Sequence, residues 1–367
     1  MRYTRRAAAR TGYICAVYNL RRGDVESHAR LKCSGTRVPH LDGSRLGRAH
    51  MEAPTLGEIR AAAEGLREVV VRTPLVPLHS YDGKRDIWLK PEIHQAVTSF
   101  KIRGVFNAVS VLDAAARAAG LSTVSAGNTA QALAWTGRHF GVPARAIMPD
   151  SAPRTKIEAM RKYGGEPVLV PMAEVFRFLK EQVWEREPFA FIHPWTNRNV
   201  MIGHGTIGLE VIEDMPEVEA ILVPVGGGGL IGGIASAVKA LKPSVRVYGV
   251  EPKGCAALAE SFRRGAPASV DCHTICDGVA VPYVTAEVFG VLNGLVDDVL
   301  VVSDEVVVRT VRRLGLGNRI IVEPSGALSV AAALEMPESK RGRCVCIVTG
   351  GSIDVHMLLG IFAEPGP

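Results

Sequence analysis

Short apolar segments alternate with helix-like segments along this chain from Pro54 onward. The segments "ARAIMP" (144–149), "EPVLVP" (166–171) and "AILVPV" (220–225) have the length and apolar character of strands buried on both faces. Each is followed by a segment with helical spacing, such as "LIGGIASAVKAL" (230–241). Buried strands that alternate with helices are typical of parallel sheets covered by helices on both faces. The sequence therefore predicts an α/β fold.

Several helix boundaries can also be predicted. Thr55 precedes a helical pattern and has the side chain of a helix N-cap. Gly141 is expected to end the helix predicted in "GNTAQALAWTGRHFG" (127–141). Residues 103–119 have alanine-rich helical spacing, which places Lys101 at the entrance of a helix.

Length and charge exclude some classes of protein. The 367 residues are enough for about two domains, and the chain has no apolar run long enough to span a bilayer. Residues 1–50 carry eleven Lys or Arg and three Asp or Glu, a net of +8, which leaves −2 for the rest of a chain whose total is +6. Because the basic charge belongs to the N-terminal segment, we expect no nucleic-acid partner and no membrane partner.

Residues 1–53 form a basic extension without apolar periodicity. A disordered tail, a transit-like segment and translated sequence ahead of a start at Met51 are the three interpretations of it. We expect the extension to be disordered or non-native, and a chain that starts at Met51 to keep its activity and stability.

The seven cysteines have irregular spacing, and their number is odd. This usage suits a reducing cytoplasm better than a disulfide framework. Cys272 and Cys276 have no second pair that would complete a metal site, so we expect buried core thiols.

Lys101 lies between Phe100 and Ile102 in "VTSFKIRGVFNAV". A lysine there can pack its stem and extend its ammonium to water. Alternatively, a desolvated lysine near a helix N-terminus favours the neutral amine, which condenses with carbonyl groups. The lysine alone does not decide between the two.

The loop "PVGGGGLIGG" (224–233) places four consecutive glycines between a buried strand and a helix. Bare backbone N–H groups at a helix N-terminus can bind a phosphate. A close-packing turn is the other explanation, but four glycines carry a large entropic cost. We therefore favour a phosphate site at Gly226–Gly229.

Two further loops follow predicted strands. "SAGNT" (Ser125–Thr129) offers small polar groups suited to a carboxylate or a phenolic oxygen, although an ordinary helix cap would look the same. "VTGGSID" (348–354) places the hydroxyl of Thr349 after a strand. Strand-end loops gather at the carboxyl edge of parallel sheets. Together with Lys101 and the glycine loop, they point to one cofactor, pyridoxal 5′-phosphate (PLP).

These motifs, in this order, resemble the fold-type II PLP enzymes, in particular the serine/threonine dehydratase (threonine ammonia-lyase) and serine racemase branch. The resemblance covers about residues 54–362 and rests on "TSFKIRGVFNA", "SAGNTAQALA", "GHGTIGLE", "VPVGGGGLIGGIA", "DGVAV", "EPSGA" and "TGGSID". It implies a tryptophan synthase β-like fold of two open parallel-sheet αβα domains with the cofactor between them.

The resemblance also implies roles for particular residues. Lys101 would form the Schiff base with PLP and act as the catalytic base, with Phe100 against the ring. Asn128 would bind the 3′-oxygen, and Thr349 the pyridine nitrogen. The phosphate would be held by Gly226, Gly227, Gly228, Gly229 and Leu230, and the substrate carboxylate by Ser125, Ala126, Gly127, Asn128 and Thr129.

Three departures from the family pattern carry expectations. Thr129 stands where this branch often has His. The cation site of many relatives corresponds to Glu251, Cys255 and Ala257, and the missing carboxylate leads us to expect no firmly bound metal. In relatives that racemise serine, a hydroxyl occupies the position of Ala126, so the alanine favours elimination.

The resemblance implies β-elimination of L-threonine and/or L-serine to a 2-oxo acid and ammonia, with a small amino acid as substrate. A serine racemase, a dehydratase of another β-hydroxy amino acid and a non-catalytic nucleotide- or phosphate-binding module are the alternatives. We expect a large PLP-binding domain (54–112 and 196–362), a small substrate-side domain (113–195), no C-terminal regulatory domain, a homodimer and a cytoplasmic location.

Overall fold

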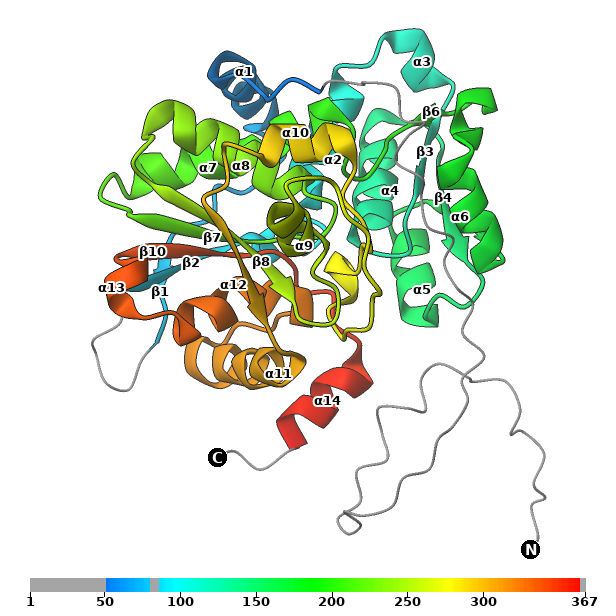
Figure 1. Cartoon of the computed structure of the whole chain (residues 1–367). Coiled ribbons are helices and arrows are strands. Elements are labelled where there is room, and N and C mark those ends of the chain that lie inside the picture. The colour runs from blue at the N-terminus through cyan, green and yellow to red at the C-terminus, as the bar shows by residue number, and fades with distance from the viewer. Residues whose placement is uncertain (1–50, 80–85, 364–367) are drawn as a thin grey trace, which may run out of the picture. The chain divides into compact units, whose positions relative to one another are not determined.

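The computed structural model describes residues 51–79 and 86–363 of the chain, which form a fold built on a larger and a smaller sheet (Figure 1). The basic residues 1–50, about which the sequence makes several predictions, lie outside the described residues. Residues 52 and 53 are described, and their carbonyls accept hydrogen bonds from Arg198. No helix of the described residues is long and apolar enough to cross a membrane.

The larger sheet has six strands in the order β1-β2-β10-β7-β8-β9. Its strands pair in parallel from β2 to β9, whereas β1 pairs with β2 antiparallel at the edge. The strand bounds are β1 Val76–Pro77, β2 Ile87–Pro91, β7 Ala220–Pro224, β8 Arg246–Pro252, β9 Asp298–Val302 and β10 Cys344–Val348.

Alternate residues of the central strands enter two different apolar cores. Ile221 and Val223 of β7 pack with one core, while Leu222 packs with the other. Helices α7 and α8 cover the first face, and α11 and α12 cover the second (Figure 1). A strand buried on both faces cannot alternate polar and apolar residues, which explains the continuous apolar runs in the sequence.

The smaller sheet has four parallel strands in the order β5-β4-β3-β6. On β4, Ala146 and Met148 pack beneath α4 and α5, and Ile147 packs beneath α6 on the opposite face. The bounds are β3 Leu121–Val124, β4 Ala144–Pro149, β5 Glu166–Val170 and β6 Ala190–Phe191. This sheet lies within residues 113–195, and the domain boundaries themselves stay a prediction.

The predicted helix signals act where the sequence places them. Thr55 forms a capping box with Glu58 at the start of α1. Gly141 ends α4 with φ +66°, a left-handed conformation that favours glycine. The helices are α1 Leu56–Leu66, α2 Lys101–Ser110, α3 Ala114–Ala118, α4 Asn128–Phe140, α5 Arg154–Lys162, α6 Met172–Lys180, α7 Arg198–Asp214, α8 Gly229–Leu241, α9 Ala257–Arg264, α10 Ala286–Leu292, α11 Asp304–Arg313, α12 Pro324–Glu335, α13 Glu338–Arg341 and α14 Val355–Ala363.

The helix predicted through residues 103–119 is two helices, so this expectation was wrong at its C-terminal half. Helix α2 ends at Ser110, and Asp113 adopts an extended conformation and caps the short α3. The Asp113 carboxylate accepts the backbone N–H of Ala116 at 2.8 Å. An aspartate that binds nearby backbone competes with helix continuation, and alanine spacing alone does not reveal this competition.

Candidate functional site

Lys101 is the first residue of α2 and lies next to the loop that follows β10. The backbone N–H of Phe100 donates to the carbonyl of Thr349 at 3.1 Å. The Lys101 Nζ atom lies 4.9 Å from the centroid of the Phe100 ring. Burial lowers the pKa of Lys101 to about 8, although the charge of Glu323 acts in the opposite direction. A lysine with this pKa supplies neutral amine near neutral pH.

The loop after β10 approaches Asn128 and Glu323 closely. A side chain at Gly350 would overlap the Glu323 carboxylate and come within 3.0 Å of the Asn128 amide nitrogen. The neighbouring Thr349 is buried, and its hydroxyl donates to the carbonyl of Ser325 at 3.5 Å. Glycine at position 350 therefore lets residues from three distant segments of the chain meet.

The loop from Ser125 to Thr129 joins β3 to α4. The Ser125 hydroxyl accepts the backbone N–H of Gly127 at 3.1 Å. Asn128 begins α4, and its Nδ2 donates to Glu323 Oε1 at 2.8 Å. Ser125, Ala126, Gly127 and Asn128 are half-buried, whereas Thr129 is buried. Small polar groups at this helix start are thus accessible at the edge of the sheet.

The four glycines Gly226–Gly229 connect β7 to α8, as the sequence predicts. Gly228 has φ +86°, a backbone conformation that side chains rarely adopt. A side chain at Gly227 would overlap the Trp195 ring, and one at Gly228 would lie 2.6 Å from Val288. Close packing therefore accounts for the glycines by itself, and phosphate binding by their N–H groups stays a prediction.

Contacts connect the glycine loop with the region around Lys101. Phe100 and Leu230 belong to one apolar core, against which Trp195 also packs. On the other side, a side chain at Gly226 would lie 3.1 Å from the Cα of Val279. The preceding residue, Gly278, donates its N–H to Ser325 Oγ at 2.9 Å. The predicted residues thus surround one region of the fold.

Glu323 is a buried acid of this region that the sequence analysis did not single out. Its pKa rises to about 7, mainly through burial and further through Asp277, while Lys156, Asn128 and Lys101 oppose the rise. It stands in the motif "EPSGA", immediately before the N-terminal turn of α12. The sequence signal for Glu323 was an acid beside apolar residues just ahead of a helix. Its hydrogen-bond partner Asn128 could not be predicted, because it lies 195 residues away in the chain.

Glu323→Gln is expected to change how stability depends on pH. The folded state raises the pKa of Glu323 above its ordinary value of 4.5, so the carboxyl stabilises the fold when protonated and this contribution is lost as pH rises towards about 7. Glutamine stays neutral and can still accept from Asn128. The free energy of unfolding of the variant, relative to that of the unmutated protein, should therefore rise by about 1–3 kcal/mol between pH 5 and pH 8. Urea unfolding at both pH values measures the change, and parallel pH dependences would contradict it.

An ion pair connects the small sheet with the loop beside the glycines. Lys156 of α5 pairs with Asp277, which directly precedes Gly278. Asp277 is also one of the charges that raise the pKa of Glu323. The pair therefore joins α5 to the segment that reaches Ser325 and the glycine loop.

Glu251 caps a helix in this structure. Its carboxylate oxygens accept the backbone N–H groups of Leu258 and Ala259 of α9, each at 2.9 Å. Burial raises the pKa of Glu251 to about 7, although the backbone hydrogen bonds oppose the rise. Among the described residues there is no group of three or more His, Cys, Asp or Glu side chains that could hold a metal ion. The weak metal affinity stays a prediction.

The expectation of buried thiols was wrong for one pair of cysteines. Cys255 and Cys272 form a disulfide, with their Cα atoms 4.4 Å apart. Cys276, Cys344 and Cys346 are buried free thiols, as predicted. The sequence places the bonded cysteines 17 residues apart, and only the folding of the loop between β8 and α10 brings them into contact.

The residues present fit a bound PLP molecule. Lys101 supplies an amine whose pKa is lowered to about 8, and Asn128 supplies an amide beside a buried acid. The indole N–H of Trp195, next to the glycine loop, is buried without a hydrogen-bond partner among the described residues. A buried donor of this kind is suited to an anionic ligand.

Comparisons with known proteins give one family. The family described as "Pyridoxal-phosphate dependent enzyme" matches residues 66–350. An L-threonine ammonia-lyase of Thermotoga maritima is 36% identical over 311 residues, which cover 83% of this chain and 77% of the relative. A serine racemase of Schizosaccharomyces pombe is 35% identical over 308 residues, 83% of this chain and 95% of the relative.

Solved structures agree with this relationship. The structure of maize serine racemase superposes with a TM-score of 0.78 at 34% identity, and covers 84% of this chain and 97% of that chain. The predicted fold-type II architecture is thereby confirmed, and so is PLP as the cofactor. This chain belongs to the family of pyridoxal-phosphate dependent enzymes.

Proposed function

We propose that this chain catalyses the PLP-dependent β-elimination of L-threonine and/or L-serine to a 2-oxo acid and ammonia. The observation that carries the proposal is Lys101 at the start of α2, where burial lowers its pKa to about 8 and the charge of Glu323, which accepts a hydrogen bond from Asn128, acts on it. Relatives named L-threonine ammonia-lyase at 36% and 38% identity support the substrate class.

Lys101 is proposed to hold PLP and to serve as the base of the reaction. PLP, when bound, supplies an electron sink for the charge that develops at the substrate Cα atom. Once the amino group of the substrate has replaced it on PLP, the neutral Nζ atom of Lys101 would remove the proton from Cα, which a lowered pKa favours near neutral pH. The β-hydroxyl group then leaves with a proton as water, and hydrolysis of the released enamine gives the 2-oxo acid and ammonia.

The other predicted residues are proposed to bind and orient. Ser125 and the backbone N–H groups at the start of α4 bind the substrate carboxylate, favoured by the positive end of the helix dipole. Asn128 and Thr349 contact the cofactor ring, and the N–H groups of Gly226–Gly229 and Leu230 bind its phosphate. A hydroxyl at Thr349, rather than a carboxylate, is consistent with elimination in preference to transamination.

Elimination is expected to exceed racemisation by at least about 100-fold, the contribution of one positioned acid or base group. Racemisation needs a second proton donor on the face opposite Lys101, and Ala126 has none to offer. Ala126 is half-buried and packs at the edge of the apolar cluster around Met148 and Met160. Ala126→Ser should introduce measurable D-serine from L-serine.

Chiral chromatography of both reactions tests this expectation. Ala126→Val serves as the control, because it changes side-chain volume without adding a proton donor. Abundant D-serine from the unmutated enzyme would show that another group supplies the proton. A serine racemase is the second candidate function, since relatives with this name reach 34–35% identity.

A substrate panel tests the function itself. Release of 2-oxo acid should be measured from L-threonine, L-serine and 3-hydroxyaspartate, together with the visible absorbance of the purified protein. Bound PLP with turnover of another substrate would redirect the proposal to a dehydratase of a different β-hydroxy amino acid. Protein that binds phosphate compounds but neither PLP nor amino acids would favour a non-catalytic module.

We further propose a homodimer in the cytoplasm. The dimer is an inference from the resemblance. The cytoplasmic location is an inference from the irregular spacing and odd number of the cysteines, against which the disulfide Cys255–Cys272 stands. Light scattering coupled to size exclusion tests the first, and fractionation of cells the second.

A further inference from the structure

The disulfide Cys255–Cys272 joins two loops that are also packed backbone to backbone. Cys255 follows β8, and Cys272 lies between α9 and α10. The N–H of His273 donates to the carbonyl of Gly254 at 2.8 Å. A side chain at Gly254 would overlap the carbonyl oxygen of His273. The sulfur bond therefore secures a contact in which the two loops are already packed without space between them.

From Cys272 the chain runs directly to the PLP site. We call residues 268–284 the tethered segment. Its middle section pairs with Lys156 through Asp277, and donates to Ser325 through Gly278. The next residue, Val279, lies against Gly226 of the glycine loop. Movement of this segment would therefore displace residues that pack against the glycine loop.

The two arms of the tethered segment also hold each other. Val270 donates its N–H to the carbonyl of Pro282 at 2.8 Å, and Val284 donates to Ala268 at 3.2 Å. The ring of Tyr283 lies 6.2 Å from that of Trp195, which packs on the glycine loop. The segment is thus a compact loop. It is attached to the rest of the fold by the disulfide, by Asp304, which accepts from Thr274 and Ile275, and by the contacts of Asp277 and Gly278.

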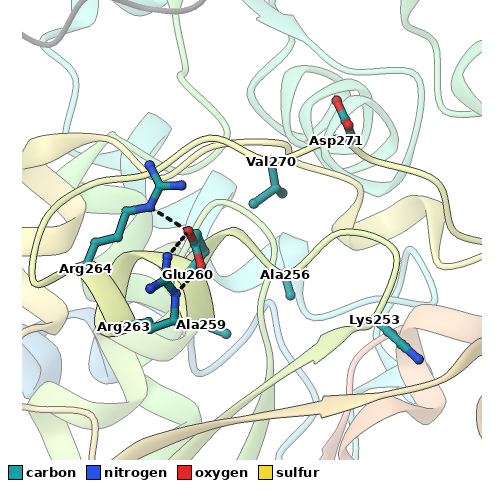
Figure 2. Close-up of a pocket in the computed structure, with 8 residues that line it drawn as sticks. All are labelled: Lys253, Ala256, Ala259, Glu260, Arg263, Arg264, Val270 and Asp271. Carbon is teal, nitrogen blue, oxygen red and sulfur yellow. Dashed lines mark hydrogen bonds and ion pairs between the residues drawn. The ribbon is translucent and has the colours of Figure 1, made fainter.

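A surface pocket of about 330 Å³ is lined by residues that neighbour the two cysteines in the sequence (Figure 2). Ala256 and Ala259 of the α9 region line one wall, and Val270 and Asp271 line the other. Cys255 directly precedes the first wall, and Cys272 directly follows the second. Cys255 is buried, whereas Cys272 is half-buried, so Cys272 is the more accessible sulfur for a small thiol.

We propose that Cys255–Cys272 is a redox-controlled tether that couples the tethered segment to retention of PLP. A small dithiol is the reductant. Its thiolate attacks the sulfur of Cys272, the Cys255 sulfur leaves and takes up a proton, and the second thiol of the reductant then releases the Cys272 thiol. The protein disulfide gains two electrons and two protons, and the dithiol becomes a disulfide.

Thermodynamic linkage requires the effect of the disulfide on PLP binding and the effect of PLP on the disulfide to be equal. If the disulfide strengthens PLP binding by some factor, bound PLP must favour the disulfide over the dithiol by the same factor. We expect this factor to be at least about fivefold, the lower end of measured couplings between sites. Reduction should also lower the melting temperature by a few degrees, because the bond closes a loop in the unfolded chain.

Two titrations on the full chain test the proposal. The first measures the dissociation constant of PLP from visible absorbance, without substrate, in oxidised and in reduced dithiothreitol. The second measures the disulfide–dithiol ratio by thiol alkylation and mass spectrometry in mixtures of both forms, with and without PLP. The factor by which reduction weakens PLP binding should equal the factor by which PLP shifts the disulfide–dithiol ratio. Neither measurement depends on turnover or on the identity of the substrate.

Serine variants identify the cysteines responsible. Cys272→Ser and the double variant Cys255→Ser/Cys272→Ser should bind PLP in oxidising buffer as the reduced protein does, and reductant should not change their affinity. An affinity ratio below about threefold in the unmutated chain overturns the proposal. So does alkylation that finds both cysteines free after air oxidation, or a response to reductant that persists in the double variant.

Discussion

Lys101→Ala is expected to lower 2-oxo acid production by about 10⁴-fold or more, the upper end of what one positioned acid or base contributes. The variant should also lose the visible absorbance that bound PLP gives with the unmutated chain. It should remain folded, because the substitution removes an amine whose burial already lowers its pKa to about 8. Circular dichroism and thermal unfolding check that the fold is retained.

Lys162→Ala is the matched control for this experiment. Lys162 lies exposed at the end of α5, so its loss removes one lysine without touching the site. A Lys101→Ala variant that keeps most of its 2-oxo acid production would refute the assignment of the nucleophile. If Lys101→Ala loses the absorbance but the unmutated chain does not turn over threonine or serine, Lys101 remains the residue that holds PLP and the proposed substrates are wrong.

Arg103→Ala is expected to destabilise the fold by about 3–5 kcal/mol, the cost of leaving buried partners of an ion pair uncompensated. Arg103 is fully buried two residues after Lys101. Its guanidinium donates to Glu92 at 2.7 and 2.9 Å and to Glu210 at 2.6 and 3.1 Å. The network connects α2 to α7 and to the turn after β2, so its loss should also weaken PLP binding by displacing Lys101.

Arg154→Ala provides the comparison at the surface. Arg154 pairs with Glu158 on α5, but its side chain is 89% exposed, and exposed pairs of this kind contribute little to stability because water screens their charges. Urea unfolding of both variants separates the two cases. An Arg103→Ala variant within about 1 kcal/mol of the unmutated chain would show that water or repacking compensates Glu92 and Glu210.

Local signals determined the elements of this fold well. Strand β4 occupies the predicted residues 144–149, and Gly141 ends α4 as predicted. Such features depend on the period of apolar residues, on backbone conformations that only glycine adopts readily, and on caps within one turn. The ordered motifs also determined the family and PLP, which the comparisons confirm.

Long-range contacts were decided by the tertiary structure alone. The sequence singled out Asn128 but not its partner Glu323, and it treated Cys255 and Cys272 as thiols although they are bonded. Likewise, nothing in the sequence indicated that Arg103 and its partners Glu92 and Glu210 are buried. Whether a side chain is desolvated, paired or bonded depends on which distant segments fold against it. The apolar period and the caps determine the elements, whereas their packing determines the pKa values, the disulfide and the surroundings of Lys101.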